Sequence, residues 1–236
     1  MSKKREFDDG AIVKFFNYVW WFLLANFYFW VLNIPFIFVV LGMMTNSTVN
    51  VNMIIIAVFS SIPMGPALTA LLSLMGKLTR DGYVDVKKDF FKAYKINFKQ
   101  SVFFWIVGMS IITLSWIELL YFKNNHELNQ VGIIPLVIIL ICIALGVYIF
   151  PLISRFHLKK KEVLIFAILS LFKKSYICIV SIVTAYILWI IFIKIKLAII
   201  LLLFFVSIIC YLVMLLEKGM IQDIEEKYNN KDVEVQ

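Results

Sequence analysis

Residues 131–153, VGIIPLVIILICIALGVYIFPLI, decide the fold because they form an uninterrupted apolar stretch without a single charged side chain. A helix rises about 1.5 Å per residue, so crossing a bilayer core about 30 Å thick takes about 20 apolar residues. We therefore predict that this stretch is a transmembrane helix.

Further stretches have the same character, and the chain as a whole is apolar. Hydrophobic residues make up 62% of it, charged residues only 16%, and the mean hydropathy is +0.92. A soluble globular enzyme, a disordered regulator and a free nucleic-acid binder are excluded, because water could not solvate so much apolar surface. The sequence predicts an all-α integral membrane bundle of six transmembrane helices, at residues 18–44, 51–75, 102–122, 131–153, 176–193 and 197–216.

Basic residues predict the orientation of this bundle. Of the 23 Lys and Arg residues, twenty fall in alternate segments: the N-terminus 1–17, the second and fourth loops, and the tail 217–236. Because basic loops stay in the cytoplasm, we expect a protein of the cell membrane with both termini cytoplasmic. The last two spans are separated by a short turn at Lys194 and Lys196.

The two long basic loops are each predicted to contain a short interfacial helix. In the first, Asp85 is placed to cap a helix on which Val86, Phe90, Tyr94 and Phe98 recur every four residues among lysines. This pattern is typical of a helix lying on anionic lipid, and the alternative is a docking surface for a cytoplasmic partner. The second helix is residues 163–172, which are too few to span the membrane.

The two basic loops also resemble each other. FKAYKINFKQS at residues 91–101 aligns without gaps on IFAILSLFKKS at residues 165–175, and an arginine precedes each, Arg80 or Arg155. An internal duplication or chance similarity would both account for this match.

Within the spans, residues 51–75 hold the most unusual pattern. Pro63, Gly65 and Pro66 interrupt the helix, and a kink there has to face protein or water. Ala57, Ser61, Gly65, Thr69 and Ser73 recur every four residues as a stripe of small side chains. The stripe favours close helix packing, and the alternative is a substrate or ion path at a broken helix.

Three polar residues in the spans are further candidates. Asn26 and Asn33 share one face of the first span and are expected to form interhelical hydrogen bonds rather than to contact a ligand. Glu118 lies near the outer end of the third span, where it could serve a function or pair with a lysine.

Catalytic, metal and cofactor sites are not expected. The two histidines, His126 and His157, stand at neither metal nor triad spacing, and no Gly-rich phosphate loop is present. We therefore expect a protein that is not an enzyme and that binds no cofactor.

Several segments together resemble the YesL family of Gram-positive bacterial membrane proteins. They are Asn26-x-x-x-Trp30 with Ile34-Pro35, GPALTALLSLMGKLTRDG at residues 65–82, DFFKAYKINFKQS at residues 89–101 and YIFPLISRF at residues 148–156. The resemblance implies a membrane location, unknown biochemistry and an association with carbohydrate ABC importers. It implies no catalytic residues.

The sequence thus leads to two functional hypotheses. The first is a non-enzymatic accessory protein of carbohydrate uptake, with membrane lipids and an ABC importer or its ATPase subunit as partners, and no nucleic acid. The second is a small-solute transporter or channel, whose path the interrupted second span and the polar face of the first span would line. Assembly as a homo-oligomer is left open. A polar cavity at mid-membrane would favour the transporter, and a packed midplane the accessory protein.

Overall fold

The computed structural model describes residues 11–45, 50–124, 131–194 and 198–233, and over these residues the chain is helical with no strand. The all-α prediction is confirmed. The helices are α1 (Ala11–Leu32), α2 (Ile34–Thr45), α3 (Val51–Ser60), α4 (Met64–Asp81), α5 (Val86–Asn124), α6 (Ile133–Arg155), α7 (Lys160–Lys173), α8 (Ser175–Lys194) and α9 (Ala198–Val233). The predicted outer loop at Ser47, the turn at Lys196 and His126 lie outside the described residues.

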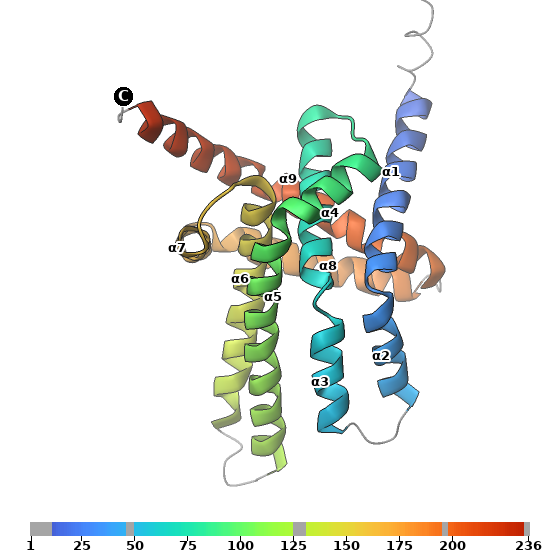
Figure 1. Ribbon diagram of the computed structural model, residues 1–236, viewed down its shortest axis with the longest axis vertical. Coiled ribbons are helices and arrows are strands. Elements are labelled where there is room, and N and C mark those ends of the chain that lie inside the picture. Colours follow the sequence, from blue (N-terminus) through green and yellow to red (C-terminus); the bar gives the residue numbers. More distant parts are fainter. Residues whose placement is uncertain (1–10, 46–49, 125–130, 195–197, 234–236) are drawn as a thin grey trace, which may run out of the picture.

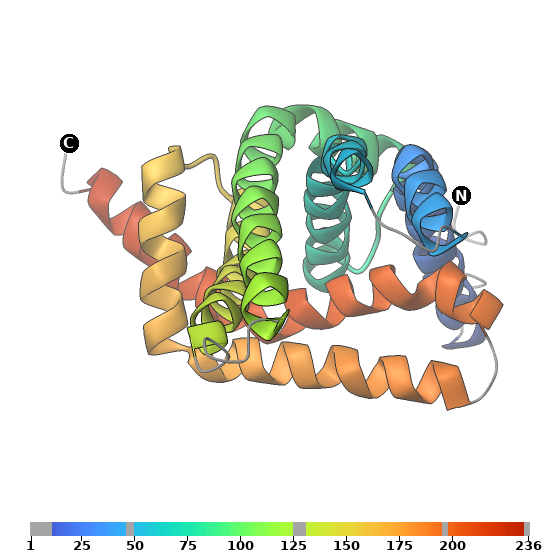
Figure 2. The same ribbon diagram turned by 90° about the horizontal axis from the view of Figure 1, so that it is seen from below.

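Four helical segments among the described residues are long and apolar enough to cross a membrane: Ile12–Leu32, Asn52–Asp81, Val86–Phe122 and Ile133–Arg155. A fifth would be the pair α7 and α8, which is bent by 85°. The first four segments run along the long axis of the bundle, whereas α8 and α9 run across it (Figures 1 and 2). The structure therefore shows several long apolar helices, and the last two predicted spans lie across the others.

Two of the predicted spans are broken. Residues 18–44 divide into α1 and α2 at Asn33, and residues 51–75 divide into α3 and α4 between Ser60 and Met64. A proline lies at each break: Pro35 is the second residue of α2, and Pro63 directly precedes α4. The proline ring removes a backbone donor and clashes with the preceding turn. The predicted kink in the second span is confirmed, and the sequence analysis missed the break in the first span.

The first predicted interfacial helix differs in the structure. Residues 86–98 are continuous with the next span as α5, since no Pro or Gly interrupts the chain before Gly108. Figure 1 shows α5 beginning across the top of the bundle and then turning down it. Val86 and Phe90 are buried in the protein core, with the Phe90 ring 5.9 Å from that of Tyr28. The prediction that this face lies on lipid was wrong for these residues, because helix α1 covers them.

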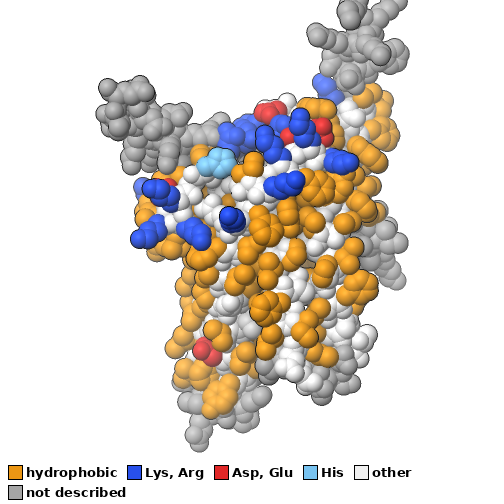
Figure 3. Space-filling model, viewed as in Figure 1, with side chains coloured by type: hydrophobic (Ala, Val, Ile, Leu, Met, Phe, Trp, Pro, Cys, Tyr) orange, Lys and Arg blue, Asp and Glu red, His pale blue; other side chains and the backbone are white. Residues whose placement is uncertain are grey.

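The core lies at the end of the bundle where the basic residues gather. Its largest fully buried side chains include Phe29, Leu71, Leu78 and Leu152, whereas α2 has no buried residue. In Figure 3 basic side chains gather at the upper end, and hydrophobic side chains cover the surface below. We call this upper end, where α4 ends, α5 begins and α6 ends, the basic end.

Candidate functional site at the basic end

Close packing of α4 on α5 positions the basic end. A Cβ atom built on Gly65 would lie 2.6 Å from Cβ of Trp105, so no larger residue fits there without a shift. One turn later, Ser101 Oγ donates to Thr69 Oγ1 at 2.8 Å, and Thr69 Oγ1 donates to the carbonyl oxygen of Gly65 at 3.0 Å. On the other side, Trp105 Nε1 donates to Ser61 Oγ at 3.1 Å. The close-packing interpretation of the small-residue stripe is therefore confirmed for Ser61, Gly65 and Thr69.

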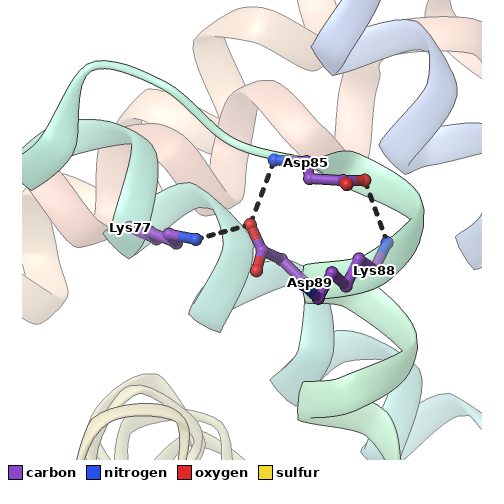
Figure 4. A network of polar contacts seen from close by, with 4 residues as sticks. All are labelled: Lys77, Asp85, Lys88 and Asp89. Atoms are coloured by element: carbon purple, nitrogen blue, oxygen red, sulfur yellow. Dashed lines mark hydrogen bonds and ion pairs between the residues drawn. The ribbon is translucent and has the colours of Figure 1, made fainter.

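The turn between α4 and α5 is held by a polar network (Figure 4). Gly82 ends α4 with a φ of +69°, a left-handed conformation that glycine adopts without strain. Asp85 accepts a hydrogen bond from the backbone N–H of Lys88 at 3.2 Å, which confirms its predicted role as a helix cap. Asp89 Oδ2 accepts from the backbone N–H of Asp85 at 3.1 Å and from Lys77 Nζ at 2.7 Å. The end of α4 is thereby tied to the first turn of α5.

A cavity of about 290 Å³ opens beside this network. It is lined by Ser73, Leu74, Lys77, Arg80, Asp89, Lys92, Ala93, Ile96, Asn97, Ile153, Ser154, Arg155 and His157. Four of these side chains are basic and one is acidic, and the acid, Asp89, already pairs with Lys77. The cavity is therefore electropositive, and an anionic group such as a carboxylate or phosphate fits its chemistry. We call it the basic cavity.

Two of the predicted candidates meet in the basic cavity although 75 residues separate them. Arg80 comes from the last turn of α4 and Arg155 from the last turn of α6, and both line it. Basic residues near a helix C-terminus also interact favourably with the helix dipole. The shared position of the two arginines is consistent with the similarity of the two loops.

A second, larger cavity of about 600 Å³ lies between α5 and α6, with contributions from α4, α7 and α9. None of its lining residues carries a charge. Neither Thr69 nor Ser61 lines it, because their hydroxyl groups face α5 in the hydrogen bonds described above. We call it the apolar cavity.

The remaining candidates lie apart from both cavities. Asn26 is fully buried and accepts a hydrogen bond from the backbone N–H of Ser207 in α9 at 3.3 Å, as expected of an interhelical contact. Asn33 is also fully buried, but its Nδ2 donates within its own chain segment, to the carbonyl oxygen of Phe29 at 2.7 Å. Glu118 is exposed on α5. Pro63 occupies the position directly before α4, and Pro66 is buried in the first turn of this helix.

Sequence reasoning missed one buried acid. Glu217 was assigned to the cytoplasmic tail, yet it is fully buried in α9, and neither carboxylate oxygen has a hydrogen-bond partner among the described residues. Burial raises the pKa of this carboxyl well above its usual range. A signal was present, because Ser207, Cys210, Met214, Glu217 and Ile221 recur every three or four residues, and all are buried.

In the part of the chain that the structure describes, no group of three or more His, Cys, Asp or Glu side chains comes together. No curated protein and no solved structure matches the chain. Residues 22–119 match the model of a protein family of unknown function, DUF624. This segment runs from α1 through most of α5, and so includes Gly65, Thr69 and Arg80 but not Arg155. In this part the chain is similar to a family whose function has not been assigned.

Proposed function

We propose that this chain is a non-enzymatic accessory protein of the cell membrane, which binds an acidic surface of a cytoplasmic partner at its basic end. The basic cavity is the observation that carries the proposal. It gathers Lys77, Arg80, Lys92 and Arg155 around space for an anionic group, and Asp89 is the one acidic side chain among the described residues that line it. The distribution of basic residues along the sequence supports a cytoplasmic position for this end and for both termini.

The lysine-rich start of α5 supports docking to a protein rather than anchoring to lipid. Lys87, Lys88, Lys92, Lys95 and Lys99 are exposed, while Val86 and Phe90 on the opposite face are buried in the core. A helix anchors in an interface by burying its apolar face among lipids, and the first half of this face, Val86 and Phe90, is already covered by protein. The lysines are thus left as a charged surface on a rigid helix.

The resemblance to the YesL family supports a carbohydrate ABC importer, and its ATPase subunit in particular, as the partner.

The transporter alternative gains less support. Ser61 and Thr69 belong to the interrupted second span that would line its path, but their hydroxyl groups bond to α5. Asn26 bonds to α9, and no charged side chain lines the apolar cavity. We further propose that the four long apolar segments that run along the bundle are the membrane crossings, an even number that leaves both termini on the cytoplasmic side.

Affinity purification of the tagged full-length chain from its native membrane, after cross-linking, tests the accessory role. We expect an importer subunit to be recovered with the wild type. The double variant Lys92→Glu and Arg155→Glu should lose it, because both substitutions reverse charge in the basic cavity. Lys173→Glu, an exposed lysine at the far end of α7, is the matched control and should retain the subunit.

Two results would contradict this proposal. The first is recovery of no importer component by any version of the chain. The second is equal recovery by the wild type and the double variant, provided that the intrinsic fluorescence of the variant shows an intact fold.

A further inference from the structure

We propose that the apolar cavity is the acyl-chain site of an anionic phospholipid, and that Lys160 holds the phosphate of this lipid at the mouth of the cavity. This site is separate from the basic cavity, and the inference does not depend on the identity of a cytoplasmic partner.

The size and chemistry of the apolar cavity point to a hydrocarbon occupant. Its volume of about 600 Å³ lies within the range of about 300–1,000 Å³ that is usual for ligand sites. Phe104, Gly108, Ile112, Cys142 and Gly146 are among its lining residues, and none of the lining side chains is charged. A sugar or an ion would leave its own polar groups unpaired there, which is costly. An alkyl chain has no polar groups, so it leaves no hydrogen bond unmade when it enters the apolar cavity.

The apolar cavity is open toward the surface that faces lipid. Val107 and Ile111 of α5 and Ile143 of α6 line it, and each of these side chains is also exposed on the outside of the bundle. All three lie within helices that are long and apolar enough to span the membrane. An acyl chain can therefore enter sideways from the bilayer without passing through water.

A cation stands at the edge of the apolar cavity. Lys160 Nζ lies 3.8 Å from the ring centroid of Phe103, and Phe103 lines the cavity. Leu164, one turn further along α7, lines it as well, so the helix that begins with Lys160 continues into the cavity wall. The neighbouring Lys159 and Lys161 are exposed. A phosphate beside Lys160 is therefore placed for its attached acyl chain to follow Phe103 and Leu164 inward.

The occupant is an anionic lipid rather than a neutral one because Lys160 stands at the mouth of the apolar cavity, and the adjacent Lys159 and Lys161 add positive charge nearby. Each Lys near an anionic headgroup contributes about fivefold in affinity. In Figure 3 basic side chains lie at the same end of the bundle, directly above the hydrophobic surface. This is the order of charge and hydrocarbon in a phospholipid.

Native mass spectrometry of the full-length chain in detergent tests this inference, with three probes. They are dioleoyl phosphatidylglycerol, dioleoyl phosphatidylcholine with the same chains, and glycerol 3-phosphate as a soluble anion. We expect phosphatidylglycerol to bind at least fivefold more tightly than phosphatidylcholine, and glycerol 3-phosphate to compete only weakly, since it cannot fill the apolar cavity.

Two variants separate the headgroup from the acyl chain. Lys160→Gln should weaken phosphatidylglycerol binding about fivefold and phosphatidylcholine binding less, because choline neutralises the phosphate charge, whereas Lys173→Gln should change neither. Gly108→Leu should weaken both lipids, because a Cβ atom at Gly108 meets nothing within 4 Å and the larger side chain occupies the cavity. Gly42→Leu is the matched control, since Gly42 has equally open space but does not line the cavity.

Three outcomes would overturn the inference. Equal binding of both lipids by wild type and Lys160→Gln would mean that the lysine holds no headgroup. Binding of glycerol 3-phosphate as tight as that of phosphatidylglycerol would indicate a site for a soluble anion. Unchanged lipid binding by Gly108→Leu would show that no acyl chain occupies the apolar cavity.

Discussion

Replacing Gly65 by alanine is expected to destabilise the bundle, although alanine is normally the better residue in a helix. The added Cβ atom would lie 2.6 Å from Trp105 Cβ, 2.9 Å from Trp105 Cγ and 3.0 Å from the carbonyl oxygen of Ser101. Two of these atoms are fixed to the backbone of α5, so the helices have to move apart. Overpacking of this kind costs about 1–3 kcal/mol.

A second loss comes from the hydrogen bond one turn away. Ser101 Oγ donates to Thr69 Oγ1 at 2.8 Å, and both residues are fully buried. Lengthening this bond adds about 1 kcal/mol. The intrinsic preference of the helix for alanine over glycine returns about 1 kcal/mol. We therefore expect Gly65→Ala to be less stable than wild type by about 1–3 kcal/mol.

The apparent melting temperature in detergent, followed by intrinsic tryptophan fluorescence at a fixed heating rate, measures this effect. Gly42→Ala is the control, because its Cβ atom meets nothing within 4 Å and α2 has no buried residue. The control should be as stable as wild type or more so. If Gly65→Ala melts at or above the temperature of Gly42→Ala, α4 and α5 do not approach as closely as the structure shows, and the reasoning fails.

Three further predictions concern the network, the buried acid and the topology. Asp89→Asn should lower the apparent melting temperature by an amount equivalent to at most about 1 kcal/mol, because Lys77, the partner of Asp89, is partly solvated. The difference between variant and wild type should shrink in high salt, and a difference independent of salt would contradict an ion pair. In the wild type, the raised pKa of Glu217 means that the folded state holds its proton over a pH range where the unfolded state has lost it. Stability should therefore fall as pH rises from about 4.5 toward the folded-state pKa, and Glu217→Gln should remove this slope. Reporter fusions should read cytoplasmic after Gly82 and external at Ser47, and the reverse would overturn the predicted orientation.

Local patterns in the sequence predicted the features that depend on one helix and its immediate neighbour. The small-residue stripe identified the face of α4 that meets α5, since only small residues permit so close an approach. The cap at Asp85 and the kink at Pro63 were also predictable, because each depends on the backbone chemistry of a few adjacent residues. The all-α architecture followed from the length of the apolar stretches alone.

Features that depend on the partner of a helix face could not be predicted in this way. Phe90 repeats at the helical period, as a residue facing lipid would, and only the fold shows that Tyr28 covers it. Arg80 and Arg155 were noticed for the similarity of their surroundings, but nothing in the sequence placed them around one cavity. In a membrane protein, lipid and protein are equally apolar neighbours, so hydrophobicity cannot tell which of them a helix face meets.

The direction of α8 and α9 across the other helices could not be predicted for the same reason, because hydrophobicity does not identify the neighbours of a helix. Their apolar stretches are long enough to span a membrane, and composition alone therefore placed them upright. The contacts that hold α9 are specific and distant in sequence: Asn26 of α1 accepts a hydrogen bond from the backbone of Ser207, and Met214 occupies the space beside Gly76 of α4. An asparagine and a glycine on two other helices thus provide two of the contacts along α9. The information on helix direction lies in such small and polar residues of neighbouring helices rather than in the apolar stretch itself.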